Sequence, residues 1–171
     1  MADAVESVLE QWREARPDLD PSPIGVVGRV LRLARMWDRE IREFLAQFGL
    51  EPGEFDILST LRRSGEPDGL TASSFLRASL VTSGAITLRI DRMQAKGLVI
   101  RVRDPLDRRS IRISLSSQGL ELVDRVLPLH FANHMRLIQE LNGDERDSLE
   151  GILSNLLETR GDLYGSKSVE A

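Results

Sequence analysis

The chain has 171 residues and carries 23 lysine and arginine residues against 27 aspartate and glutamate residues, a net charge of −4 at pH 7. This length predicts one domain with short terminal extensions, and the 41% apolar content is enough for a sizeable core. No cysteine is present, which excludes disulfides, thiolate zinc sites and thiol-based catalysis or redox sensing. The acidic total argues against nucleic acid as a partner, unless the charge is unevenly distributed along the chain.

The sequence also contains no signal for a membrane or for export. No apolar run reaches the roughly 18 residues that a membrane-spanning helix needs. Residues 1–20 are too acidic for a signal or transit peptide. We therefore expect a soluble, cytoplasmic protein.

The first third of the chain has the apolar spacing of three helices. Four apolar residues within residues 5–12 predict a short amphipathic helix, which the prolines at residues 17–23 end. Apolar residues at alternating three- and four-residue steps predict a long helix over residues 24–48. Pro52 then opens a third helix, and residues 65–69 form a polar turn.

The middle of the chain changes from helical to alternating spacing. Two short helices are predicted over residues 71–79 and 82–96, with threonine at the N-cap of each. Apolar and polar residues then alternate over residues 98–103 and 110–115, with two aspartates and a proline between them. These patterns predict a helix-turn-helix followed by a β-hairpin with a charged tip.

The last third is predicted to be helical again, with one helix over residues 120–141, kinked at Pro128, and another over residues 144–159. The fold class is therefore mainly α with a small β-hairpin wing, that is, a winged helix-turn-helix. We expect one intertwined domain with three regions: the N-terminal and first dimerisation helices (1–48), the winged helix-turn-helix (49–116), and the C-terminal dimerisation helices with a short tail (117–171).

The charge is unevenly distributed. Residues 82–112, which we call the basic strip, hold eight basic and three acidic residues, a net charge of +5. The remainder holds 15 basic and 24 acidic residues, a net charge of −9. A basic helix next to a basic hairpin tip is typical of a protein that inserts a helix into the major groove of DNA and touches the flanking backbone with a wing. The ordinary alternative is that the charges of the basic strip form a solvated polar surface that binds no partner.

Within the helix over residues 82–96, Ile86, Ile90 and Met93 share one side and predict its buried face. The other side offers hydroxyl, apolar and guanidinium groups for phosphates and base edges. We expect DNA contacts from Thr82, Ser83, Thr87, Leu88 and Arg92. Leu88 also has the alternative of a second packing contact.

At the hairpin tip, Asp107 and Arg109 are two residues apart and can pair on one side of the loop. Such a pair would stabilise the wing while Arg108 or Arg109 reaches a narrow minor groove. The alternative is an exposed ion pair that contributes well under about 1 kcal/mol.

Two segments of the chain resemble the MarR family of winged helix-turn-helix regulators. The sequence DPLDRRSIRISLSSQG at residues 104–119 is similar to the family's wing signature, with Ser116 where threonine is more usual. The sequence TSGAITLRIDRMQAKGLV at residues 82–99 is similar to its recognition helix and following strand. The resemblance implies a homodimer that binds a pseudo-palindromic DNA operator as a repressor.

Further segments resemble the urate-responsive branch of that family, which has an added N-terminal helix. They include RPDLDPSP at residues 16–23, GEFDILSTLRRSG at residues 53–65 and LPLH at residues 127–130. The resemblance implies a ligand site formed by Trp12, Asp56, Arg89 and Arg101.

An indole and two guanidiniums suit a planar, anionic purine such as urate, and Asp56 would respond to its charge. In the ligand-free state, Asp56 could instead pair with an arginine. Taken singly, each residue has an ordinary structural alternative, such as packing for Trp12 or phosphate contacts for the two arginines. A different aromatic or organic-acid ligand is the alternative regulator, and a winged-helix protein-interaction module without a ligand is a further one.

The rest of the sequence offers no other chemistry. His130 and His134 lie four residues apart on a predicted helix, a spacing that can hold a metal, but no carboxylate cluster accompanies them, so we expect packing or solvent contacts. No nucleophile and base set, phosphate loop or metal motif is present, so we expect neither an enzyme nor a cofactor.

Overall fold

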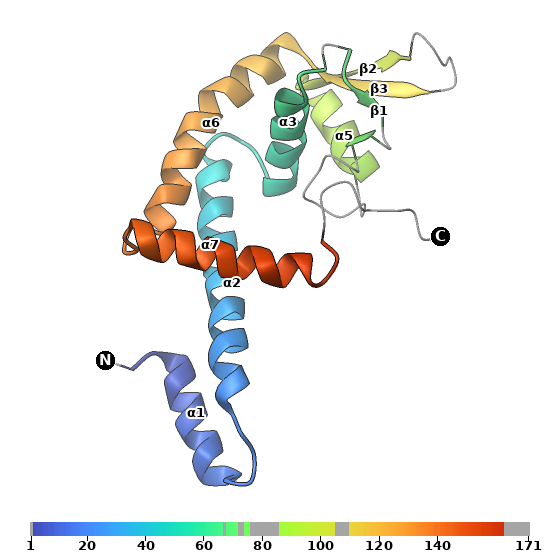
Figure 1. Cartoon of the computed structure of the whole chain (residues 1–171). Coiled ribbons are helices and arrows are strands. Elements are labelled where there is room, and N and C mark those ends of the chain that lie inside the picture. The colour runs from blue at the N-terminus through green and yellow to red at the C-terminus, as the bar shows by residue number, and fades with distance from the viewer. Residues whose placement is uncertain (1, 67, 72–73, 76–85, 105–109, 163–171) are drawn as a thin grey trace. The chain divides into compact units, whose positions relative to one another are not determined.

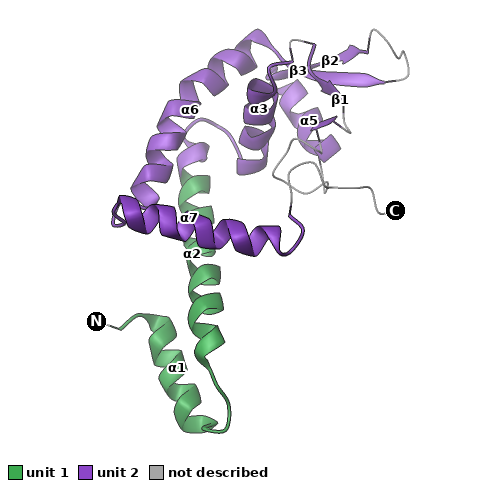
Figure 2. Ribbon diagram, viewed as in Figure 1, with its two compact units in different colours: residues 1–43 green, residues 44–171 purple. Residues whose placement is uncertain are grey.

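The computed structural model describes residues 2–66, 68–71, 74–75, 86–104 and 110–162. The chain divides into two compact units, residues 1–43 and residues 44–171 (Figure 2). Within the described residues, no helix has the length and apolar character needed to cross a membrane.

The first unit is an antiparallel pair of helices, α1 (Ala4–Ala15) and most of α2 (Ser22–Ala46) (Figure 1). The predicted short amphipathic helix and the long helix are both confirmed. Asp3 caps α1 by accepting hydrogen bonds from the backbone amides of Val5 and Glu6 at 2.8 and 3.0 Å. Gly28 lies against Val5, and a Cβ placed at Gly28 would approach Val5 Cγ1 to 3.3 Å. Small residues on α2 therefore allow α1 to pack closely.

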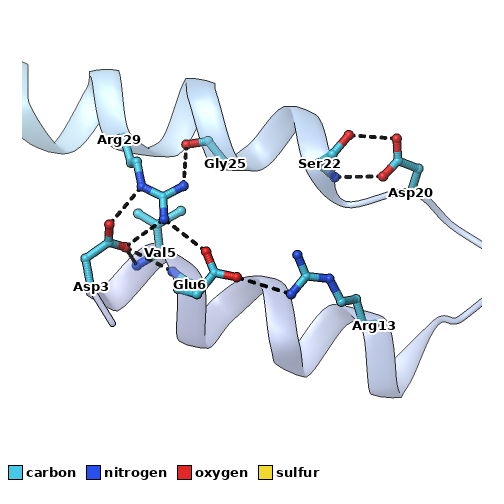
Figure 3. A network of polar contacts seen from close by, with 8 residues as sticks. All are labelled: Asp3, Val5, Glu6, Arg13, Asp20, Ser22, Gly25 and Arg29. Carbon is cyan, nitrogen blue, oxygen red and sulfur yellow. Dashed lines mark hydrogen bonds and ion pairs between the residues drawn. The ribbon is translucent and has the colours of Figure 1, made fainter. Parts of the chain in front are cut away.

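One arginine links the two helices of this unit (Figure 3). The Arg29 guanidinium donates to Asp3 Oδ2 at 2.8 Å and to Glu6 Oε2 at 3.1 Å, and Arg29 also donates to the Gly25 carbonyl at 2.9 Å. The hydrogen bond from Arg29 lowers the pKa of both the Asp3 and the Glu6 carboxyl groups. These pairs are exposed, so they orient α1 on α2 more than they stabilise it.

In the second unit, α3 (Pro52–Ser64) starts at a proline, as predicted, and ends at Gly65, whose φ of 67° lies in the left-handed region. The Glu54 carboxylate accepts a hydrogen bond from the Glu51 amide at 3.0 Å at the start of this helix. Of the two predicted helices that follow, the structure describes a helical turn at Ser74 and Phe75 and then α5 (Ile86–Ala95). The Ser74 amide donates to Thr71 Oγ1 at 3.2 Å, the contact expected for the predicted cap.

The predicted hairpin is confirmed as β2 (Val99–Arg103) and β3 (Ile111–Leu115), which pair antiparallel. A third strand, β1 (Leu70–Thr71), pairs with the other edge of β3 and gives the order β1-β3-β2. The strand was not predicted: Leu70 was given no element and Thr71 was expected to cap a helix, because a two-residue strand is too short to show alternation.

Beyond the sheet, Ser116 caps α6 (Ser117–Leu137) by accepting a hydrogen bond from the Gly119 amide at 2.9 Å. The helix continues through Pro128 but ends at Leu137, four residues before the predicted end. Asn142 and Glu145 form a capping box at the start of α7 (Gly143–Glu158). No residue of α7 is buried within this chain.

The core of the second unit lies where α3, α5, α6 and the sheet meet, since α3 contacts α5, α6 and β3. Its fully enclosed members come from every one of these elements. They include Leu45, Ile57, Leu58, Phe75, Met93, Val99, Val123 and Val126. This core fixes α5 and the hairpin relative to each other, which is what a DNA-reading surface requires.

Candidate nucleic-acid interface

The two sides of α5 differ as the sequence predicted. Ile86, Ile90 and Met93 are buried against the core. Thr87, Leu88 and Arg92 lie on the exposed side. Leu88 is 52% exposed, so much of its surface is open to a partner, and its assignment to a DNA contact stays a prediction. The exposed side of α5 is therefore a polar surface with one apolar residue available for a partner.

Five residues of the predicted interface lie outside the described residues. They are Thr82 and Ser83 at the start of the recognition helix and Asp107, Arg108 and Arg109 at the hairpin tip. Their assignment to DNA contacts or to stabilisation of the wing stays a prediction.

A basic residue just beyond the end of α5 is held by a buried carboxylate. Lys96 Nζ lies 2.7 Å from both carboxylate oxygens of Glu54, and it donates to the Gly49 carbonyl at 3.1 Å. Glu54 is only 2% exposed. The pair ties the C-terminal end of α5 to the start of α3, so part of the positive charge of Lys96 is neutralised within the chain.

Arg101 on β2 also has partners within the chain, both on α5. Its guanidinium forms an ion pair with Asp91 and donates to Gln94 Oε1 at 2.7 Å. Arg101 was predicted to bind a ligand, and in the structure its guanidinium contacts Asp91 and Gln94. An anion that binds Arg101 has to compete with Asp91, which lies on the exposed side of α5.

A third basic residue of the strip, Arg112 on β3, pairs with Asp104 at an Nε to Oδ2 distance of 2.7 Å. Of the eight cations in the basic strip, Lys96, Arg101 and Arg112 thus have described carboxylate partners. Asp91 and Asp104 are already subtracted in the net charge of +5, so Glu54 is the described partner that lowers the charge of the strip beyond that count.

Three of the four predicted ligand residues lie on elements that contact one another: Asp56 on α3, Arg89 on α5 and Arg101 on β2. Arg89 of α5 covers Gly53 of α3, and a Cβ at Gly53 would lie 2.8 Å from Arg89 Nε. Gly53 and Asp56 are three residues apart, so they share a face of α3. Asp56 is half-buried, while the Trp12 side chain is 46% exposed and belongs to the other compact unit.

The two histidines lie on α6, and His130 is packed among aromatic rings. The His130 ring centroid is 4.5 Å from that of Phe55, 5.9 Å from that of Phe44 and 4.1 Å from that of His134. Burial lowers the pKa of His130 from 6.5 to about 4, with a further contribution from His134. Burial lowers the pKa of His134 as well. Among the described residues, no group of three or more histidines or carboxylates could hold a metal ion.

Sequence reasoning did not assign a role to Glu54, Asp91 or Asp104, the carboxylates that hold the three basic residues. Glu54 and Lys96 are 42 positions apart, so no local spacing links them. Asp104 opens the wing signature, which was the one available signal for its part in the hairpin.

A helix with an exposed polar face next to a small antiparallel sheet is typical of winged-helix DNA-binding proteins. A model of the MarR family matches residues 48–110. The HTH-type transcriptional regulator PecS of Dickeya dadantii (strain 3937) is 33% identical over 152 residues, covering 89% of this chain and 92% of PecS. The chain therefore belongs to the MarR family of transcriptional regulators, which bind DNA and are not enzymes.

Solved structures support the same fold. A mutant MarR from Escherichia coli complexed with operator DNA matches with a TM-score of 0.68 at 24% identity, covering 85% of this chain and 97% of that one. BpsR of Bordetella bronchiseptica, studied for regulation of its DNA binding by 6-hydroxynicotinic acid, matches with a TM-score of 0.69 at 21% identity, covering 77% and 91%. Family membership sets aside the alternative of a winged helix that does not bind DNA.

Proposed function

We propose that this protein is a cytoplasmic transcriptional repressor that binds a pseudo-palindromic operator as a homodimer and is released by a small anionic ligand. Urate or a related purine is our candidate ligand, and a different aromatic or organic acid is the alternative. The observation that carries the proposal is the exposed side of α5, where Thr87, Leu88 and Arg92 stand in a locally basic part of an acidic chain.

The homodimer is supported by apolar side chains that this chain leaves exposed. Large exposed apolar residues lie on α2, α6 and α7, and α7 buries none of its residues within the chain. They include Val26, Val27, Leu31, Phe131, Ile152, Leu156 and Leu157. A second copy is the occupant that fits, because faces of this size are rare on monomers and the MarR family resemblance implies a dimer.

The anionic ligand is supported by the arrangement of Arg89, Asp56 and Arg101. Arg89 lies over the face of α3 that carries Asp56, so an anion that binds Arg89 would add negative charge near that half-buried carboxyl group. An anion at Arg101 would displace Asp91 and leave its carboxylate unpaired on the DNA-reading side of α5. The added negative charge near Asp56 and the unpaired Asp91 carboxylate would both repel DNA phosphates and so weaken DNA binding.

The class of ligand is supported by the side chains proposed to bind it, namely two arginines and a tryptophan. Two guanidiniums recognise a planar anion through paired hydrogen bonds, and an indole can stack on it. The regulation of BpsR by 6-hydroxynicotinic acid shows that a protein of this fold can respond to a planar heteroaromatic acid. Urate, xanthine and 6-hydroxynicotinate should therefore be titrated against the complex with operator DNA. We expect urate or a related purine to release the DNA at the lowest concentration.

Operator binding can be tested by fluorescence anisotropy, with labelled DNA from upstream of the protein's own gene. We expect Arg109→Ala to weaken binding more than about tenfold, the loss that one good groove contact accounts for. We also expect affinity to fall steeply with salt, because phosphate contacts release counterions. Unchanged affinity in the Arg109→Ala protein would remove the wing from the mechanism.

A further inference from the structure

Arg112 was counted with the DNA-facing charge of the basic strip, yet its side chain is directed into the protein. It donates from Nε to Asp104 Oδ2 at 2.7 Å and from a terminal nitrogen to the Gly69 carbonyl at 3.1 Å. The Arg112 side chain is 23% exposed and that of Asp104 is 7% exposed. A buried carboxylate requires such a partner, because burial without one is costly.

Asp104 closes the described end of the hairpin. Its backbone amide donates to the Ser110 carbonyl at 3.0 Å, one step beyond the pairing of Arg103 with Ile111. The five positions between Asp104 and Ser110 include Asp107, Arg108 and Arg109, the residues proposed to act at the wing tip. Asp104 therefore makes the last described contact between the two strands before the tip.

Gly69 lies where the chain enters the helix-turn-helix. Its φ is 79°, and a Cβ there would lie 2.2 Å from the Ile113 carbonyl oxygen, so only glycine fits this close approach. The strand that follows pairs Thr71 with Arg112, and Thr71 in turn accepts the hydrogen bond from the Ser74 amide. Arg112 thus contacts both the base of the wing and the entry to the helix-turn-helix.

We propose that Arg112 is a positioning residue for DNA binding. Through Asp104 and the Gly69 carbonyl, it fixes the wing relative to the helix-turn-helix and makes no phosphate contact. The inference rests on the proposed operator binding. A guanidinium suits this role because its fork of donors satisfies a carboxylate and a carbonyl in one fixed geometry, which an ammonium cannot reproduce.

Asp104→Asn separates positioning from phosphate contact, because it removes the partner of Arg112 without removing a positive charge. If Arg112 positions the wing, we expect Asp104→Asn to weaken operator affinity at least about fivefold, within the range for a lost groove contact. Arg112→Met should weaken it as well, and the double variant should bind within about twofold of Arg112→Met, since coupled residues are not additive. If Arg112 instead contacts phosphate, Asp104→Asn binds as tightly as the wild type or tighter, which would overturn the proposal.

Two further variants complete the experiment. Glu121→Gln removes one negative charge at an exposed position of α6 and should leave operator affinity within about twofold of wild type. Arg112→Lys keeps the charge, so loss of affinity with this variant supports positioning, whereas near wild-type affinity contradicts it, even if Asp104→Asn does not fold. Circular dichroism and thermal unfolding establish that each compared variant is folded. Failure of the wild type to bind operator DNA would contradict the proposed function itself, an outcome distinct from failure of this inference.

Discussion

At the scale of single residues, two glycines mark places where backbone segments approach too closely for any side chain. Besides Gly69, Gly119 at the start of α6 lies against the backbone of Leu98, and a Cβ there would come within 1.9 Å of the Leu98 carbonyl oxygen. Ser116 also donates to the Gly97 carbonyl at 2.5 Å. The end of the wing signature, SSQG, thus joins α6 to the sheet, so its residue types follow from packing and capping.

We predict that Gly119→Ala destabilises the protein by about 3 kcal/mol or more, because a backbone carbonyl cannot move aside cheaply. Gly143→Ala is the matched control, since nothing lies within 4 Å of a Cβ there. At that helical position, alanine should be neutral or stabilising by up to about 1 kcal/mol. Urea unfolding at fixed protein concentration measures both variants, and equal effects would contradict the close approach.

His130 predicts a dependence of stability on pH. Its pKa is about 4 in the folded protein and near 6.5 when solvated, so between these values the unfolded chain binds a proton that the folded protein excludes. Stability should therefore decrease as the pH falls from about 6.5 toward about 4. Urea unfolding across this range should show a smaller decrease for His130→Phe, which keeps an aromatic ring beside Phe55. The same decrease in both proteins would rule out His130 as the cause.

At the scale of elements, the recognition helix α5 is held by polar contacts on two sides. Lys96 joins its C-terminal end to Glu54 of α3, and Arg101 of β2 pairs with Asp91 in its middle. These contacts supplement the buried face of the helix. Because the same carboxylates neutralise cations of the basic strip, they both orient α5 and limit the charge that it presents to DNA.

We predict that Lys96→Met lowers stability by about 1 to 3 kcal/mol, because it leaves the buried Glu54 carboxylate without its cation. Arg42→Met is the control, since the Arg42 and Asp38 pair within α2 is exposed on both sides. That change should cost less than about 0.5 kcal/mol. Thermal or urea unfolding compares the two variants, and a neutral Lys96→Met would show that the pair does not hold α5.

Local patterns predicted most elements, because capping residues and apolar periodicity act within one helix or strand. They predicted α1, the proline start of α3, the hairpin strands and α7. They did not predict β1, whose two residues are defined only by pairing with Ile113 and Arg112. Periodicity also placed the end of α6 at Leu141, whereas the helix ends at Leu137.

The sequence could not predict the ion pairs of the site, because their partners lie far apart along the chain. No partner on α5 was predicted for Arg101, and the structure gives Asp91 and Gln94 as its partners. The charge count likewise gave no partners for Lys96 and Arg112, which pair with Glu54 and Asp104. Pairing between residues on different elements depends on packing, which neither charge counts nor spacing can report.

At the scale of the whole molecule, a net charge of −4 is compatible with DNA binding because the charge is segregated. The basic strip carries +5 and the rest of the chain −9, so the acidic remainder discourages non-specific adhesion to DNA. The exposed apolar residues of α2, α6 and α7 form a further kind of surface, separate from the basic strip. One surface is suited to DNA, and the apolar faces are suited to a second copy of the chain.

We predict a dimer at micromolar concentration by light scattering. Ile152→Glu on α7, where Ile152 is 59% exposed, should shift the protein toward monomer because a charge cannot be buried in an apolar interface. Ser154→Glu adds the same charge on another side of α7 and should remain dimeric. A wild-type monomer would contradict the dimer, and equal dissociation of both variants would remove the apolar side of α7 from the interface.

The proposed release of DNA by an anionic ligand that binds near Trp12 can be tested in one titration. The chain has two tryptophans, so in Trp37→Phe the fluorescence of Trp12 is observed alone. Urate is added to the complex of this variant with labelled operator DNA, while tryptophan fluorescence and DNA anisotropy are recorded together. We expect both signals to change with the same midpoint, and we expect Trp12→Phe to lose the release of DNA. DNA that stays bound while urate quenches Trp12, or release that persists in Trp12→Phe, would contradict release of DNA through a ligand site at Trp12.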